Sequence, residues 1–153
     1  MNAPTNIDAP LLAIRKSYTA SPQAVFDAFT VPQALSSWFN PSGGSCEVEI
    51  DLQIGGRYSI KMGLPEGEVA HVSGEYLEIE PGRRLAFTWA WAGTPDRVSK
   101  VQIDFAEHDE ETQITLKHTE FFDEAARDRH GHGWEACLGN LPGYLEQTPG
   151  GAV

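Results

Sequence analysis

The sequence predicts a single α+β domain, in which a meander of antiparallel strands covers one long C-terminal helix. Two patterns support this prediction. Between residues 46 and 118, apolar and polar residues alternate with a period of two, as in strands that expose one face to water. Residues 123–146 instead carry apolar residues at helical spacings of three and four. An antiparallel sheet with one apolar face needs a cover, and the last helix can provide it.

Length and charge limit the functions of this domain. The chain has 153 residues, with 22 acidic and 11 basic residues and a formal net charge of −11. We expect tails over residues 1–10 and 147–153 and one domain over 11–146. An acidic protein repels phosphate backbones and anionic lipids, so we expect neither nucleic acid nor a membrane as partner. Without a recognisable secretion signal or an apolar run of about 20 residues, we expect a cytoplasmic location with reduced cysteines.

The first part of the chain predicts a strand followed by two short helices. Alternation favours a strand over residues 11–19. Ser21 followed by Pro22 is a favoured helix start, because serine caps free N–H groups and proline lacks one. This helix is expected over residues 22–29. A second short helix begins at Pro32 and ends in a segment rich in glycine, serine and proline.

Six further strands are predicted by alternating apolar residues and the turns between them. They are expected near Cys46–Leu52, Tyr58–Met62, residues 68–80, Leu85–Trp91, Val101–Phe105 and Ile114–His118. Gly55-Gly56 predicts a tight turn, and Pro81-Gly82 predicts a type II turn, because glycine tolerates positive φ. Gly74 interrupts its strand, and we expect a β-bulge there.

The final helix is expected to begin after Asp123, whose carboxylate suits the N-cap position. Its apolar stripe contains His130, Trp134, Cys137, Leu138, Leu141 and Leu145. Pro142 removes one backbone hydrogen bond and clashes one turn back. We therefore expect a kink or an early end near residues 138–142.

A curved sheet around a helix tends to leave a cavity between them. The ligand-binding residues that we expect in this cavity are Trp38, Tyr58, Met62, Trp89, Trp91, His118, His130, Trp134 and Leu138. Tryptophan and tyrosine combine an apolar ring with a polar hydrogen that can orient a ligand. A neutral imidazole at His118 or His130 could do the same, or act as an acid or base.

No spacing in the sequence predicts a metal site or a catalytic set. His130 and His132 lie two positions apart and would point to different sides of a helix. Cys137 follows His130 by two helical turns, about 10 Å, which is too far for the hydrogen bond of a nucleophile pair. We therefore expect no metal, no cofactor and structural roles for both cysteines, and name no catalytic residue.

Five segments carry a resemblance to a known family. They are residues 21–29 (SPQAVFDAF), 35–39 (LSSWF), 54–58 (IGGRY), 74–89 (GEYLEIEPGRRLAFTW) and 132–138 (HGWEACL). In this order they resemble the activator of Hsp90 ATPase homologue family, within the START-like (SRPBCC, birch-pollen-allergen-like) superfamily. The resemblance implies a helix-grip fold. In that fold, a seven-stranded antiparallel sheet wraps around the long C-terminal helix and a hydrophobic cavity, with two short helices between the first and second strands.

Three functions are compatible with this resemblance. We favour a protein that binds a hydrophobic or aromatic small molecule in the cavity. The second is a co-chaperone-like or stress-response module whose acidic surface contacts a protein partner, such as a chaperone. The third is a cyclase, dehydratase or hydrolase that uses the cavity, as in some members of the wider superfamily. The sequence is compatible with a monomer or a homodimer.

Overall fold

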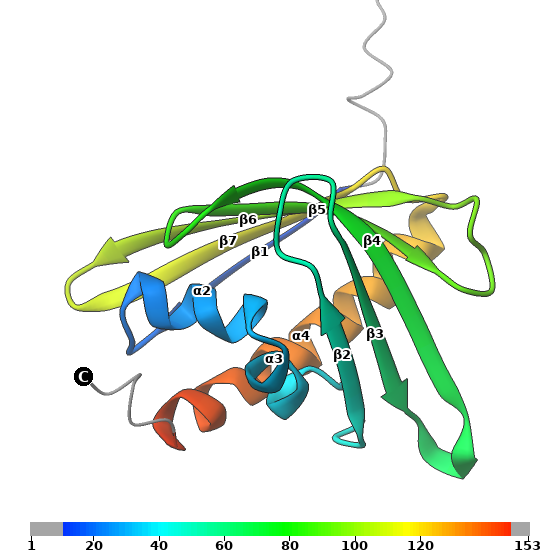
Figure 1. The fold of residues 1–153 in the computed structure, drawn as a ribbon, viewed down its shortest axis with the longest axis horizontal. Helices are drawn as coiled ribbons and strands as arrows, with labels where there is room; N and C mark the ends of the chain where they lie inside the picture. The colour runs from blue at the N-terminus through cyan, green and yellow to red at the C-terminus, as the bar shows by residue number, and fades with distance from the viewer. Residues whose placement is uncertain (1–10, 148–153) are drawn as a thin grey trace, which may run out of the picture.

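Seven antiparallel strands and three α-helices form the fold in the computed structural model, which describes residues 11–147 (Figure 1). In chain order the elements are β1 (Leu11–Tyr18), α2 (Pro22–Thr30), α3 (Pro32–Trp38), β2 (Cys46–Ile50), β3 (Arg57–Gly63), the 3₁₀ turn η1 (Pro65–Gly67), β4 (Val69–Glu80), β5 (Arg84–Trp91), β6 (Ser99–His108), β7 (Glu111–Thr119) and α4 (Glu124–Gln147). The strands lie in the order β1-β7-β6-β5-β4-β3-β2. The predicted helix-grip fold is confirmed. The predicted tails lie outside the described residues, except Gln147, which belongs to α4.

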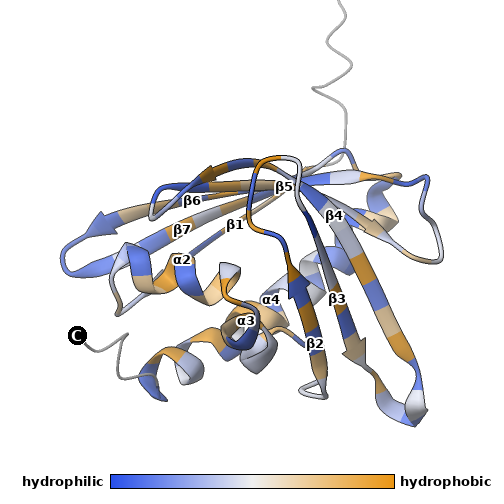
Figure 2. Ribbon diagram, in the orientation of Figure 1, coloured by the Kyte–Doolittle hydropathy of each residue, from blue (hydrophilic) through white to orange (hydrophobic). Residues whose placement is uncertain are grey.

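The core lies between one face of the sheet and the helices. Figure 2 shows the alternation of apolar and polar residues along the strands that produces this face. Ile60, Leu85 and Ile103 from the sheet share one buried cluster with Phe26 and Leu141 from the helices. Burying each such side chain contributes about 1.5–3 kcal/mol. Within residues 11–147, no helix has the length and hydropathy needed to cross a bilayer.

The predicted start of α2 and the predicted turn before β5 are both present in the structure. The Ser21 hydroxyl accepts a hydrogen bond from the Ala24 N–H at 3.1 Å, and Pro22 begins α2. Gly82 has a φ of 74°, and the Arg83 N–H donates to the Glu80 carbonyl at 2.8 Å. These are the features of the predicted type II turn.

The bulge in β4 lies at Leu77, not at Gly74 as predicted. Pairing with β5 shifts by one residue between Tyr76 and Glu78. Gly74 has a different role, because a Cβ at this position would collide with the carbonyl oxygen of Thr88. The Tyr58 ring covers the glycine, and its hydroxyl donates to the same carbonyl at 2.6 Å.

Strand β2 is shorter than predicted. It ends at Ile50, and Leu52 lies in the following loop with 42% of its surface exposed. This loop bonds to β4 instead, since the Gly55 N–H donates to the Tyr76 carbonyl at 2.9 Å. Because this loop turns toward β4, the alternation of buried and exposed side chains along β2 stops at Ile50.

Helix α4 continues to Gln147, so the early end predicted near residues 138–142 is wrong. Pro142 lacks the N–H that would bond to the carbonyl of Leu138, four residues earlier. The Tyr18 hydroxyl donates to that carbonyl at 3.2 Å. A side chain of β1 therefore replaces the hydrogen bond that the proline removes.

Candidate functional site

An apolar cavity of about 200 Å³ lies where β3 and β5 face the first half of α4. Its lining consists of Phe39, Pro41, Met62, Trp89, Trp91, Arg129, His130, Gly133, Trp134 and Cys137. An apolar cavity of about 150 Å³ in another protein binds benzene. This cavity therefore has room for a small aromatic molecule.

Glycines on α4 keep this space open and bring the helix close to the sheet. A Cβ at Gly133 would meet no atom within 4 Å, although the residue lines the cavity. Two residues earlier, on another side of the helix, a Cβ at Gly131 would lie 3.3 Å from the Leu12 side chain on β1. Gly131 therefore permits close packing, whereas Gly133 leaves unfilled volume.

His118 is fully buried and holds one wall of the cavity in place. Its Nδ1 accepts a hydrogen bond from Trp134 Nε1 at 3.0 Å. Its Nε2 lies 2.7 Å from the Ser99 hydroxyl, and because Nδ1 accepts, Nε2 carries the proton of the neutral ring. Burial, with the charge of His130 as a second cause, lowers the pKa of His118 to about 2. The ring is neutral and orients Trp134.

His130 makes a matching pair with Trp91. Its Nε2 accepts from Trp91 Nε1 at 2.9 Å, and its Nδ1 donates to the Ala126 carbonyl at 2.7 Å. Burial lowers the pKa of His130; the Ala126 hydrogen bond opposes this shift, and the charge of Arg129 adds to it. Both nitrogens of His118 and of His130 have partners, so neither ring presents a free nitrogen to a ligand.

Trp89 differs from the other tryptophans of the molecule. Trp38 donates to the Ala28 carbonyl at 3.0 Å, and Trp91 and Trp134 donate to histidines. Among the described residues, Trp89 Nε1 is buried without any hydrogen-bond partner, and the side chain is only 5% exposed. A buried donor without an acceptor costs about 1–3 kcal/mol. A ligand that brings an acceptor to Trp89 would recover this free energy.

The structure places the predicted ligand-binding residues in two groups. Five of them line the cavity: Met62, Trp89, Trp91, His130 and Trp134. The other four do not. Trp38 and Leu138 are buried in the core, His118 lies behind Trp134, and Tyr58 borders a separate void of about 20 Å³.

The cavity also contains residues that the sequence analysis did not include: Phe39, Pro41, Arg129, Gly133 and Cys137. Two of these could have been predicted from apolar residues at helical spacing. Phe39 follows Leu35 by four residues, and Cys137 belongs to the apolar stripe of the last helix. Arg129 and Gly133 could not be predicted in this way, since neither contributes to apolar periodicity.

The cysteines are free thiols. Burial raises the pKa of Cys46 to about 11 and that of Cys137 to about 12, with the charge of Cys46 as a second cause at Cys137. Both side chains are therefore protonated and weakly nucleophilic at neutral pH. Within residues 11–147, no three His, Cys, Asp or Glu side chains gather where they could hold a metal ion.

Several solved structures share this fold. A protein of Chromobacterium violaceum is 27% identical with a TM-score of 0.82, over 90% of this chain and 98% of that protein. CalU16 of Micromonospora echinospora is 29% identical with a TM-score of 0.70, over 90% of this chain and 76% of CalU16. An Hsp90 activator of Plasmodium falciparum is 23% identical with a TM-score of 0.73, over 90% and 96% of the two chains, and shares the fold.

A comparison with curated protein sequences found no match. The family model described as "Activator of Hsp90 ATPase homolog 1-like protein" matches residues 19–146. This match agrees with the resemblance carried by the five sequence segments and with the helix-grip fold. The chain therefore belongs to the activator of Hsp90 ATPase homolog 1-like family.

Proposed function

We propose that this protein binds a small aromatic molecule in the cavity between the sheet and α4. The observation that carries the proposal is the unpartnered N–H of Trp89, buried in a wall of that apolar cavity. The ligand therefore combines an apolar ring system with at least one hydrogen-bond acceptor.

Geometry supports binding more than catalysis. Five aromatic or imidazole rings of the lining form one cluster of contacts. Between ring centroids, Trp89 lies 5.5 Å from Trp91, 6.1 Å from His130, 5.3 Å from Trp134 and 6.3 Å from Phe39. These rings offer edges and faces to a planar guest. Both imidazoles that could transfer protons already use both nitrogens, so we assign no catalytic residue.

Calorimetry with 2-naphthamide tests this proposal, because the compound joins two fused apolar rings to a carbonyl acceptor. We expect a dissociation constant between micromolar and millimolar, as for a ligand of this size. Quenching or shifting of tryptophan fluorescence should accompany binding, since three tryptophans line the cavity.

Two matched variants locate the binding site. Gly133→Leu places a side chain in the cavity and should weaken binding at least tenfold. Gly139→Leu is the control, because a Cβ there meets no atom within 4 Å and the residue lies on α4 outside the cavity. Both changes replace a helical glycine with a better helix former, so neither should unfold the protein. Undiminished binding to the Gly133→Leu variant, or no binding to the parent protein, would overturn the proposal.

A second candidate is a module that binds a chaperone of the Hsp90 type, alone or together with a ligand. The family match and the fold shared with an Hsp90 activator of Plasmodium falciparum support it. An ATPase assay with a purified bacterial Hsp90 homologue tests this candidate, which predicts stimulation that saturates with added protein. A cytoplasmic location and the choice between monomer and homodimer stay predictions.

A further inference from the structure

A second, smaller pocket of about 60 Å³ adjoins the cavity. The two spaces share Trp89, Trp91, Arg129 and His130. Trp91 and His130 are joined by a hydrogen bond, so this pair is held in place at the border that the two spaces share. The side pocket is completed by Thr94, Arg97, Ser99, Phe121, Phe122 and Ala126. It is more polar than the cavity and contains a second arginine.

Arg97 and Arg129 both line the side pocket, and within residues 11–147 neither forms an ion pair. Among the described residues, no carboxylate lies within 4.0 Å of either guanidinium, whereas Arg84 bonds to Asp104 at 2.7 Å. The Arg97 guanidinium lies 3.7 Å from the ring centroid of Phe122, which orients it without neutralising its charge. Two positive charges therefore border one pocket.

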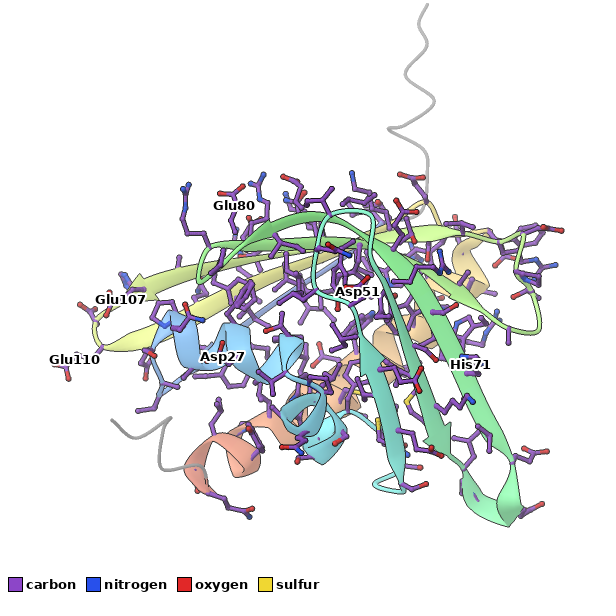
Figure 3. All side chains as sticks on the ribbon, in the orientation of Figure 1. Asp27, Asp51, His71, Glu80, Glu107 and Glu110 are labelled. Carbon is purple, nitrogen blue, oxygen red and sulfur yellow. The ribbon has the colours of Figure 1, made fainter. Side chains whose placement is uncertain are left out.

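Two carboxylates near the side pocket have other partners. Asp123 accepts a hydrogen bond from the Ala126 N–H at 2.8 Å, and Asp128 pairs with Arg127 at 3.1 Å. Figure 3 shows Glu107 and Glu110 at the tip of the β6–β7 hairpin, at the end of β6 away from the loop that carries Arg97. The lining of the side pocket therefore carries two guanidinium groups and no carboxylate.

We propose that the ligand is an aromatic carboxylic acid. Its rings occupy the apolar cavity, and its carboxylate lies between Arg129 and Arg97 at the junction with the side pocket. This inference rests on the proposed function and specifies its ligand. Guanidinium groups match carboxylates because they donate two parallel charged hydrogen bonds. A side pocket of about 60 Å³ has room for a carboxylate but not for a long polar tail.

The test compares 2-naphthoate with 2-naphthamide, which have the same rings and differ in charge. In the parent protein we expect naphthoate to bind about tenfold more tightly at low salt, as for a charge-assisted hydrogen bond. High salt should reduce this preference, because the arginines are reached by solvent. Binding of the amide should change little with salt.

Three single substitutions assign the preference to the pocket. Arg129→Gln should reduce the preference for naphthoate over naphthamide to about onefold. Arg97→Gln should reduce the preference for naphthoate by about threefold, because the charge of Arg97 borders only the side pocket. Arg127→Gln is the matched control, since it removes one positive charge from the same helix at a residue paired with Asp128 and outside both pockets.

The outcomes separate the two proposals. If the amide binds but naphthoate binds no more tightly, the carboxylate inference is overturned and the proposed function stands. If Arg127→Gln removes the preference as fully as Arg129→Gln, long-range charge explains it, and the pocket is not the anion site. If neither compound binds, both proposals fail.

Discussion

The two halves of α4 contact the same sheet with very different side chains. The first half presents Arg129, His130 and Gly133 and borders an unfilled cavity. The second half presents Leu138, Leu141 and Leu145, each at most 6% exposed and part of the core cluster. Leucine fills the space between helix and sheet, whereas glycine and histidine leave volume and place polar atoms at its border. The contrast indicates that the second half mainly stabilises the fold and the first half is available for a ligand.

The polar contacts of the two halves of α4 also differ. In the first half, imidazole rings bond to tryptophan N–H groups and hold the cavity wall. In the second half, the Tyr18 hydroxyl replaces a backbone hydrogen bond of the helix, and the Asn140 amide donates to the carbonyls of Trp38 and Asn40. Substitutions in the two halves should therefore separate stability from binding.

The largest effect is expected from Leu141→Ala in the second half. Removing a fully buried leucine should lower the free energy of unfolding by about 2–5 kcal/mol. Urea denaturation measures this loss. Under conditions where the variant is folded, its affinity for 2-naphthamide should equal that of the parent. A loss below about 1 kcal/mol would contradict tight packing in this half.

Trp134→Phe should have the next largest effect, because it leaves Nδ1 of the buried His118 without a donor. We expect a loss of about 1–3 kcal/mol in unfolding free energy, from the unsatisfied nitrogen and the smaller ring. Trp91→Phe serves as the comparison. Its partner His130 is only half-buried, so a smaller loss is expected. Equal losses in urea denaturation would argue against a special role for His118.

Stability should also depend on pH through His118. Its pKa is about 2 in the folded protein, against 6.5 for the ordinary side chain. The unfolded chain therefore binds the proton more readily, and stability falls as the pH drops below about 6.5. Between about pH 6.5 and pH 5, we expect a loss of about 1.5 kcal/mol from this residue. Urea titrations across this range measure the slope, and a flat profile would refute the prediction.

Tyr18→Phe should have the smallest effect, about 1 kcal/mol, because it removes one hydrogen bond to the Leu138 carbonyl. The control is the same change in a Pro142→Ala background. Alanine restores the backbone N–H that bonds to Leu138, so the cost of Tyr18→Phe should become smaller there. An unchanged cost in the double variant would show that Tyr18 does not compensate for the proline.

Much of the fold could be predicted from local patterns. Leu85, Phe87 and Trp89 alternate along β5, and this spacing alone assigns them to the inner face of a strand. Ser21 and Pro22 likewise define the start of α2. The bulge at Leu77 could not be predicted, because it depends on the register between β4 and β5. The hydrogen bond that Tyr18 donates to Leu138, one turn before Pro142, could not be predicted either, because Tyr18 is distant in sequence.

Apolar periodicity was enough to predict which side chains face the helix, tryptophan and histidine among them. Which of these side chains border empty space depends on how the helix and the sheet pack together. Periodicity defines a face but not depth, so His118 and Trp89 look alike in the sequence. In the structure, His118 has partners on both nitrogens, whereas Trp89 has none for its N–H among the described residues. Arg129 belongs to no apolar pattern, and its place at the cavity follows from how α4 packs on the sheet.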